Sequence, residues 1–203
     1  MLIAFEWWEW TGKTTQIEKV KEYLQNNWKK VFTTREPGGN NCHIAEKIRD
    51  LLKDPKNKNM TALTELFLFL ASRAQHTEEI IIPKIKQGYI VITDRFFGST
   101  ISYQHYARWL FDYDFIKNLN EIAIKWTYPD ITFYLDVEPE IWLKRKKELQ
   151  DCRLDAESLN FHKKVREWFL QICKKENHWY TIDASKDINK VFSKIKEQLE
   201  LQI

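Results

Sequence analysis

Short apolar stretches rich in β-branched and aromatic residues alternate along the chain with segments of helical periodicity. Five such stretches predict strands, at residues 2–5, 31–34, 89–93, 131–135 and 180–182. Helices are predicted near residues 14–27, 44–52, 61–75, 99–106, 114–125, 139–148, 157–177 and 188–201. Because strands joined by helices imply right-handed crossovers, this alternation predicts an α/β fold with three layers and a five-stranded parallel sheet.

The composition excludes several other classes of protein. The 203 residues are 43% hydrophobic and 30% charged, which excludes general disorder, and no Pro/Gly/Ser-rich linker divides them, so we expect one domain over residues 1–203. No apolar run reaches about 18 residues, and the N-terminus lacks the pattern of a signal peptide, so no membrane association is expected. The net charge of +3 is too balanced to predict bulk nucleic-acid binding. Three cysteines without metal-ligand spacing are typical of reduced thiols in a cytoplasmic protein.

A phosphate-binding motif follows the first predicted strand. After Glu6 the chain reads Trp7, Trp8, Glu9, Trp10, Thr11, Gly12, Lys13, Thr14, Thr15. Gly12 to Thr14 match the second half of a phosphate-binding loop, in which backbone N–H groups hold the phosphates of a nucleotide. In such a loop Lys13 reaches the β- and γ-phosphates, the Thr14 hydroxyl holds Mg²⁺, and the following helix directs its positive end at the ligand. The motif is short, but its place between an apolar strand and an amphipathic helix favours this interpretation.

Polar residues also follow the second and third predicted strands, at the edge where parallel sheets bind their ligands. Arg35 and Glu36 follow the second strand, and they predict a phosphate contact and an organised carboxylate, with a solvated turn as the alternative. Asp94 and Arg95 follow the third strand. The Asp suits water-mediated Mg²⁺ binding and the Arg suits bidentate phosphate binding, with a structural ion pair as the alternative.

Arginine is scarce in this chain, with eight residues against 24 lysines, and a retained Arg often marks planar, bidentate recognition. Phe69 and Arg73 lie four residues apart on one predicted helical face, so they could stack on a base and contact its edge. Core packing is the alternative for Phe69. Arg153 lies in a polar stretch, residues 144–155, that suits a lid over a transferring phosphoryl group, with ordinary surface charge as the alternative.

In their order along the chain, these motifs resemble those of bacterial thymidylate kinases. The resemblance rests on Phe5-Glu6, Gly12 to Gln16, Thr34 to Gly39, Leu68 to Arg73, Asp94-Arg95-Phe96, Ser99, Ser102-Tyr103-Gln104 and Pro129-Asp130. It extends from residue 1 to about residue 184. It implies a P-loop nucleoside monophosphate kinase fold and a homodimer. The implied reaction moves the γ-phosphoryl of ATP to dTMP, with Mg²⁺, and gives dTDP and ADP for dTTP synthesis.

The resemblance also implies a role for each site residue. Residues 7–15 form the ATP site, Thr14 and Asp94 serve the metal, and Glu36 lies near it. The dTMP site comprises Glu9, Arg35, Glu36, Phe69, Arg73, Arg95, Ser99, Tyr103 and Gln104. In that site Glu9 contacts the 3′-hydroxyl, Arg35 and Arg95 clamp the phosphate, and Tyr103 packs by the sugar. Phe69 stacks on thymine, while Arg73 and Gln104 contact its edge.

Catalysis is implied for Glu9, Lys13, Arg95 and Arg153. Arg153 resembles the lid arginine of members whose phosphate loop lacks one, as this loop does. An arginine there stabilises charge on the transferring phosphoryl group. Cys152 departs from the family, in which an Asp commonly precedes this arginine.

The numbers of Trp and Gly are abnormal in opposite directions. The chain has nine Trp and five Gly, whereas average usage of about 7% predicts roughly 14 Gly. The family commonly has Gly where this chain has Trp7, Trp8 and Trp10, and Gly is also expected at Trp28, Trp109, Trp126 and Trp168. Trp142 is a weaker case, and Trp179 could be a genuine Trp. Because indole rings would obstruct a phosphate-binding backbone, we hypothesise that UGA codons read as glycine in the source are rendered here as Trp.

Two other functions stay open at this point. If Trp7, Trp8 and Trp10 are literal, the chain is a catalytically impaired nucleotide-fold protein that retains the dTMP side. Alternatively, it is a P-loop kinase for another nucleotide. The first interpretation remains an active thymidylate kinase in the cytoplasm, with ATP and dTMP as its ligands.

Overall fold

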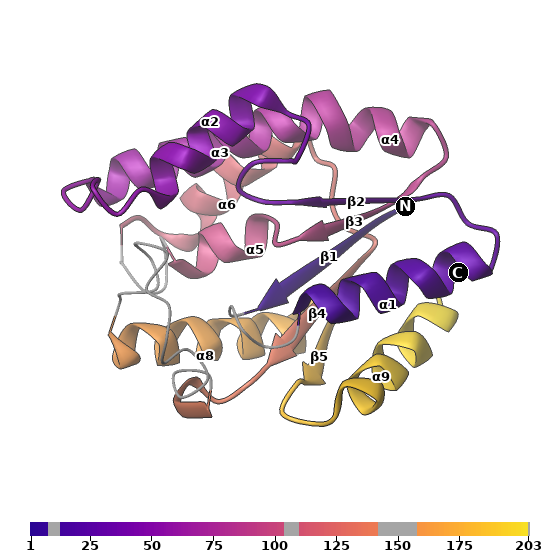
Figure 1. Ribbon diagram of the computed structural model, residues 1–203. Coiled ribbons are helices and arrows are strands. Elements are labelled where there is room, and N and C mark those ends of the chain that lie inside the picture. Colours follow the sequence, from indigo (N-terminus) through magenta and orange to yellow (C-terminus); the bar gives the residue numbers. More distant parts are fainter. Residues whose placement is uncertain (8–12, 104–109, 142–157, 203) are drawn as a thin grey trace.

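A parallel β-sheet forms the centre of the molecule in the computed structural model, which describes residues 1–7, 13–103, 110–141 and 158–202 (Figure 1). The strands are β1 (Leu2–Trp7), β2 (Val31–Arg35), β3 (Ile90–Asp94), β4 (Ile131–Asp136) and β5 (Trp179–Asp183). Their order is β2-β3-β1-β4-β5, and every neighbouring pair is parallel. All five predicted strands are therefore confirmed, as is the α/β fold.

Helices flank this sheet on both sides (Figure 1). They are α1 (Lys13–Asn26), α2 (His43–Lys53), α3 (Ala62–His76), α4 (Ile82–Lys86), α5 (Phe97–Thr100), α6 (Tyr113–Ile124), α8 (Leu159–Lys175) and α9 (Ile188–Glu200). A π-helical segment, η1 (Thr77–Ile81), joins α3 to α4. Helices α1 and α9 pack together, α3 packs against α2 and α6, and α8 lies against β4 and β5. Among the described residues, no helix is both long enough and apolar enough to cross a membrane.

The extent of two predicted helices is wrong. Thr61 caps α3 as predicted, by accepting a hydrogen bond from the Thr64 backbone N–H, but the helix continues through η1 and α4 instead of ending near residue 75. The polar residues His76 and Thr77 are buried at this point, so polarity does not mark a helix end there. The helix predicted from residue 99 begins at Phe97 as α5. Most of the helix predicted at residues 139–148 lies outside the described residues.

The strand order brings the predicted site residues to one edge of the sheet. Strand β3 lies between β2 and β1, and Asp94 pairs in register with both Arg35 and Phe5. Two backbone hydrogen bonds extend this connection beyond the strands, because Glu36 N donates to Asp94 O over 2.8 Å and Arg95 N donates to Phe5 O over 2.8 Å. The residues that follow β1, β2 and β3 are thus held side by side.

Candidate functional site

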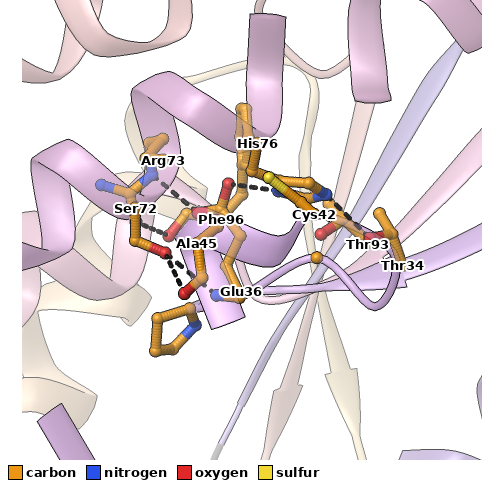
Figure 2. Close-up of polar contacts among 12 residues, drawn as sticks. Thr34, Glu36, Cys42, Ala45, Ser72, Arg73, His76, Thr93 and Phe96 are labelled. Atoms are coloured by element: carbon orange, nitrogen blue, oxygen red, sulfur yellow. Dashed lines mark hydrogen bonds and ion pairs between the residues drawn. The ribbon is translucent and has the colours of Figure 1, made fainter. Parts of the chain in front are cut away.

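A buried polar network joins the end of β2 to helix α3 (Figure 2). The Glu36 carboxylate accepts a hydrogen bond from Arg73 Nε over 2.7 Å, and its other oxygen lies 3.0 Å from His76 Nδ1. On the far side of the imidazole, His76 Nε2 lies 2.7 Å from Thr34 Oγ1. All four side chains are buried. The network therefore fixes Arg73 through a chain of contacts that begins on a strand.

Glu36 carries a negative charge inside this network. Burial alone would raise the pKa of the Glu36 carboxyl, but the positive charge of Arg73 and the hydrogen bonds from His76 and Arg73 outweigh it, so the pKa is lowered. Both Glu36 oxygens are engaged by Arg73 and His76. In this arrangement, the Glu36 carboxylate holds the Arg73 and His76 side chains in place.

The Arg73 guanidinium is fixed on several sides. Besides Glu36, it donates from Nη1 to Thr100 Oγ1 over 2.8 Å and to Asn120 Oδ1 over 2.7 Å, and from Nη2 to the Phe96 carbonyl over 3.1 Å. Four of its five N–H groups are thus used, and the fifth has no partner among the described residues. One oriented N–H suits a single hydrogen bond to the edge of a base.

Arg35 is held by a different carboxylate. Its Nη2 donates to Glu46 Oε2 over 2.9 Å, and its Nη1 donates to Asn40 Oδ1 over 2.7 Å. The second Glu46 oxygen accepts from the backbone N–H groups of Gly39 and Asn40, over 2.9 and 2.8 Å. Gly39 has a φ of 137°, and a Cβ there would lie 2.3 Å from a carbon of the His76 ring. Glycine is therefore required where this loop passes the buried network.

Glu6 anchors the segment that follows β3. Its carboxylate accepts hydrogen bonds from Phe96 N over 3.1 Å, from Ser99 N over 3.2 Å and from Ser99 Oγ over 2.6 Å. Burial raises the pKa of the Glu6 carboxyl to about 7, against the opposing effects of these hydrogen bonds and of Arg95. The same segment holds Arg95 with a left-handed φ of 67°.

The remaining predicted residues are placed as follows. Phe69 is half-buried on α3, one turn before Arg73, and Asp94 and Arg95 are half-buried after β3. The half-buried Tyr103 ring lies 5.5 Å from that of Phe161. Thr14 and Thr15 are exposed in the first turn of α1.

Several predicted residues cannot be placed in this way. Seven of them lie outside the described residues: Trp8, Glu9, Trp10, Thr11, Gly12, Gln104 and Arg153. Trp7 and Lys13 belong to β1 and α1, and only their backbones are described. The described part of the site thus comprises most of the side predicted to bind dTMP and, of the predicted ATP side, the side chains of Thr14 and Thr15 alone.

Several residues with direct side-chain contacts to predicted site residues were not among the predictions. They include His76, Thr100, Asn120, Glu46, Asn40 and Glu6. Most of their partners are distant in the sequence; His76 and Glu36, for example, are 40 positions apart. Polar residues within otherwise apolar helices were the signal available for His76 and Asn120.

Comparison with known proteins identifies the family. The family model described as "Thymidylate kinase" matches residues 5–195. The chain belongs to the thymidylate kinase family. It is 43% identical to the thymidylate kinase of Thermosipho melanesiensis over 203 residues, which are 100% of this chain and 99% of that protein. Identity to the thymidylate kinase of Clostridium novyi is 44%, over 96% of this chain and 95% of that one.

A solved structure agrees with these sequences. The crystal structure of thymidylate kinase from Ehrlichia chaffeensis matches with a TM-score of 0.78 and 37% identity, over 98% of each chain. The resemblance read from the motifs is therefore confirmed, together with the P-loop nucleoside monophosphate kinase fold. This thymidylate kinase is a transferase of nucleotide biosynthesis, an ATP:dTMP phosphotransferase.

Proposed function

We propose that this thymidylate kinase binds the dTMP base between Phe69 and the single available N–H of Arg73. The observation that supports this role concerns the Arg73 guanidinium. Four of its N–H groups donate hydrogen bonds to other residues of the protein, and the fifth has no partner among the described residues. A fixed donor at the base edge discriminates strongly, because a base that offers no acceptor there leaves a buried polar group unpaired. Gln104 completes the edge contacts, and Ser99 and Tyr103 border the nucleotide.

The substrate preference can be tested with a panel of nucleotides. Phosphate transfer from ATP to dTMP, dUMP, CMP and AMP is measured for the chain and for Arg73→Lys. We expect a preference for dTMP that Arg73→Lys reduces, because a lysine ammonium cannot reproduce the guanidinium geometry. Faster transfer to CMP or AMP than to dTMP by the unaltered chain would support a kinase for another nucleotide and overturn this proposal.

Phosphoryl transfer follows from positioning and charge. Arg35 and Arg95 clamp the dTMP phosphate, and Glu9 contacts the 3′-hydroxyl. Lys13 and residues 7–15 bind the ATP phosphates, and Arg153, in a lid over residues 144–155 of the single domain, stabilises charge on the transferring group. The reaction is an in-line displacement that needs no covalent enzyme intermediate.

Mg²⁺ fits the oxygen donors at this edge of the sheet. Thr14 offers a hydroxyl at the start of α1, and Asp94 offers a half-buried carboxylate after β3. No group of three or more His, Cys, Asp or Glu within the described part of the chain could hold a metal by itself. Mg²⁺ commonly binds through one or two protein oxygens, waters and substrate phosphates. When bound, the ion would neutralise charge on the ATP phosphates.

A homodimer is supported by an apolar face on three adjoining helices. Helix α3 packs between α2 and α6 (Figure 1). The exposed large apolar side chains of these helices are Ile44, Leu51, Leu63, Phe67, Phe115 and Ile122. Apolar residues gathered in this way are typical of an interaction surface, and a second copy of the chain would cover them.

The dimer can be tested by light scattering after size exclusion. We expect Phe67→Lys to convert a dimer into a monomer, whereas Lys117→Ala on α6 leaves it dimeric. A monomeric mass for the unaltered chain would contradict the proposal. The function proposed for this enzyme places it in the cytoplasm, where dTTP precursors are made.

A further inference from the structure

Trp28, the first tryptophan after the phosphate loop, lies at the C-terminus of a helix, at a position that is usually glycine. Helix α1 ends at Asn26, and Trp28 then adopts a left-handed φ of 60°. Trp28 N donates to Gln25 O over 3.0 Å and Lys29 N donates to Leu24 O over 3.0 Å. These two hydrogen bonds define the Schellman termination, whose left-handed residue is usually Gly. The Trp28 side chain is 96% exposed, so packing offers little to offset the strained backbone.

A second tryptophan with a left-handed backbone lies at the end of α6, one position after Lys125, which is the left-handed cap residue of that helix. Lys125 and Trp126 have φ values of 49° and 55°, two left-handed residues in succession. Trp126 N donates to Glu121 O over 3.1 Å, and Lys125 N donates to Ile122 O over 3.2 Å. The Trp126 side chain is 65% exposed. Glycine adopts this conformation without the steric cost that a Cβ brings.

Two other tryptophans behave as ordinary core residues. Trp168 on α8 and Trp179 on β5 are each only 4% exposed. Their rings lie 6.2 Å apart in an edge-to-face arrangement, and neither has a positive φ. The hypothesis made from the sequence gains structural support at residues 28 and 126. The backbone gives no reason for glycine at residue 168.

We infer that residues 28 and 126 are glycine in the protein made by its source, and that residues 7, 8 and 10, where a phosphate loop needs bare backbone N–H groups, are glycine as well. The inference joins the left-handed backbone to the counts, because glycine at these five positions would raise the glycine content from five to ten, nearer the roughly 14 that average usage predicts. A UGA codon read as glycine accounts for every such position with one cause. This conclusion goes beyond the enzyme's activity, because it states which side chains the active molecule carries.

Peptide mass spectrometry of the protein from its native source tests the inference directly. We expect the peptides covering residues 7–10, 28 and 126 to have the masses of glycine, whereas the peptide that carries Trp179 has the mass of tryptophan. Tryptophan in the native peptide at residue 28 or 126 would overturn the inference.

Thermal unfolding of the chain as printed provides a second test. We expect Trp28→Gly to raise Tm by about 2–4 °C, because it relieves a left-handed non-glycine residue. The matched variant Trp179→Gly removes a buried ring from strand β5, where no positive φ favours glycine, and should lower Tm instead. A Tm that falls in both variants would contradict the structural part of the inference.

A second inference rests on the contacts of Glu6. This side chain lies at the end of the central strand, directly before the phosphate loop, yet its hydrogen bonds go to Phe96 and Ser99 after β3. Glu6 is completely buried, and a Cβ on Gly98 would lie 2.8 Å from its Oε1, so the segment from Phe96 to Ser99 closes tightly over it. The carboxylate thus ties the segment that carries Arg95 to the strand that carries the ATP loop.

We propose that Glu6 is a positioning residue that sets the geometry of Arg95 and Ser99 for dTMP. This rests on the dTMP role proposed above for those two residues. In Glu6→Gln, the negative charge that acts on Arg95 is lost, and the amide nitrogen cannot accept the hydrogen bond that Ser99 Oγ donates to the carboxylate. Binding of dTMP should then weaken, while the ATP loop keeps its own backbone donors.

Calorimetry of dTMP binding without ATP and steady-state kinetics test this role together. We expect Glu6→Gln to raise both the Kd and the KM for dTMP about tenfold, a change that corresponds to about 1.4 kcal/mol, and the KM for ATP to change less than about twofold. An equal change in both KM values, or no change, would overturn the proposal. Should Glu6→Gln fail to fold, Ser99→Ala removes a single contact of the same carboxylate, and an unchanged Kd for dTMP in that variant would overturn it too.

Arg95→Ala separates the two proposals. If Arg95→Ala leaves dTMP affinity unchanged, the proposed phosphate clamp fails. If Arg95→Ala weakens dTMP binding but Glu6→Gln does not, only the positioning role of Glu6 fails. A double variant of Glu6 and Ser99 should show non-additive effects, because the two side chains act through one hydrogen bond.

Discussion

The side of the site proposed to bind dTMP and the side proposed to bind ATP depend on different parts of the chain. On the proposed dTMP side, buried side chains from β2, α3, α5 and α6 bind one another, and Glu36 and Arg73 lie at the centre of these contacts. A phosphate loop of the kind proposed for ATP depends on backbone N–H groups, and therefore on glycine. A site made of side chains can be recognised in the sequence from its residue types. A site made of backbone N–H groups can be recognised only from its glycines, so it is missed when these glycines appear as another residue.

This difference explains why the dTMP motifs are intact while the loop at residues 7–10 is not. Arg35, Phe69, Arg73 and Arg95 lie in the motifs on which the predicted resemblance to the family rests. A chain that had lost its function would be expected to accumulate changes on both sides. In the phosphate loop, the changes are all from the expected Gly to Trp. A single cause, the reading of the UGA codon, would explain them.

The largest expected effect is on kcat, and it distinguishes the lid arginine from the residues proposed to bind dTMP. Arg153→Ala should lower kcat by about a thousandfold, because an arginine that stabilises the transferring phosphoryl group contributes several orders of magnitude. The dTMP affinity, measured by calorimetry, should change little. The background for this experiment is the chain carrying Trp7→Gly, Trp8→Gly and Trp10→Gly, and the control is Lys194→Ala, at an exposed residue of α9. A loss of dTMP affinity with kcat unchanged would remove Arg153 from the lid role.

Disrupting the buried network around Glu36 should lower the free energy of unfolding. Glu36→Gln leaves the Arg73 charge buried without its counter-ion, and the free energy of unfolding should fall by about 3–5 kcal/mol. Urea denaturation measures this loss. The control is Glu46→Gln, whose partner Arg35 is 39% exposed and whose loss should be below about 1 kcal/mol. Equal losses in the two variants would contradict the distinction between the buried and the exposed pair.

The pH dependence of the free energy of unfolding should reveal the titration of Glu6. Its pKa is raised from 4.5 to about 7 in the folded protein, so the native state holds a proton that the unfolded chain has already released between these values. The free energy of unfolding therefore falls as pH rises from about 4.5 to about 7, by about 3 kcal/mol from this group. Denaturation curves of Glu6→Gln should lack this fall. A fall of the same size in that variant would assign it to another group.

The smallest effect concerns the loop that carries Arg35. Glu46→Gln removes one ionic contact to Arg35 while Asn40 still holds the same guanidinium. We expect a two- to fivefold increase in the KM for dTMP, about 0.4–1 kcal/mol, with the KM for ATP unchanged. An increase in the KM for ATP alone would place Arg35 on the other side of the site.

The sequence predicted the sheet and the strand-end residues because both follow from local pattern. Apolar runs define the strands, and parallel order then brings Arg35 and Asp94 to one edge. The partners of these residues could not be predicted in the same way. Asn120 lies 47 positions from Arg73 and Glu6 lies 93 positions from Ser99, and nothing in the local sequence links such pairs.

The continuation of α3 through η1 illustrates a second limit. Residues 75–79 are polar, which predicts a helix end, but His76 and Thr77 are buried because the Glu36 network and the interior accept them. Tertiary contacts therefore override the local pattern at this point. The same kind of contact identifies Glu46, which is exposed in pattern and yet fixes the loop from Arg35 to Asn40.

The central claim is that the active molecule has glycine in its ATP loop, and the rate of dTDP formation tests it most directly. We predict that the chain carrying Trp7→Gly, Trp8→Gly and Trp10→Gly has a kcat/KM for ATP at least about 100-fold above that of the chain as printed, because the backbone donors then reach the phosphates. The Kd for dTMP should be the same in both. Equal kcat/KM values for ATP in the two chains would contradict the account.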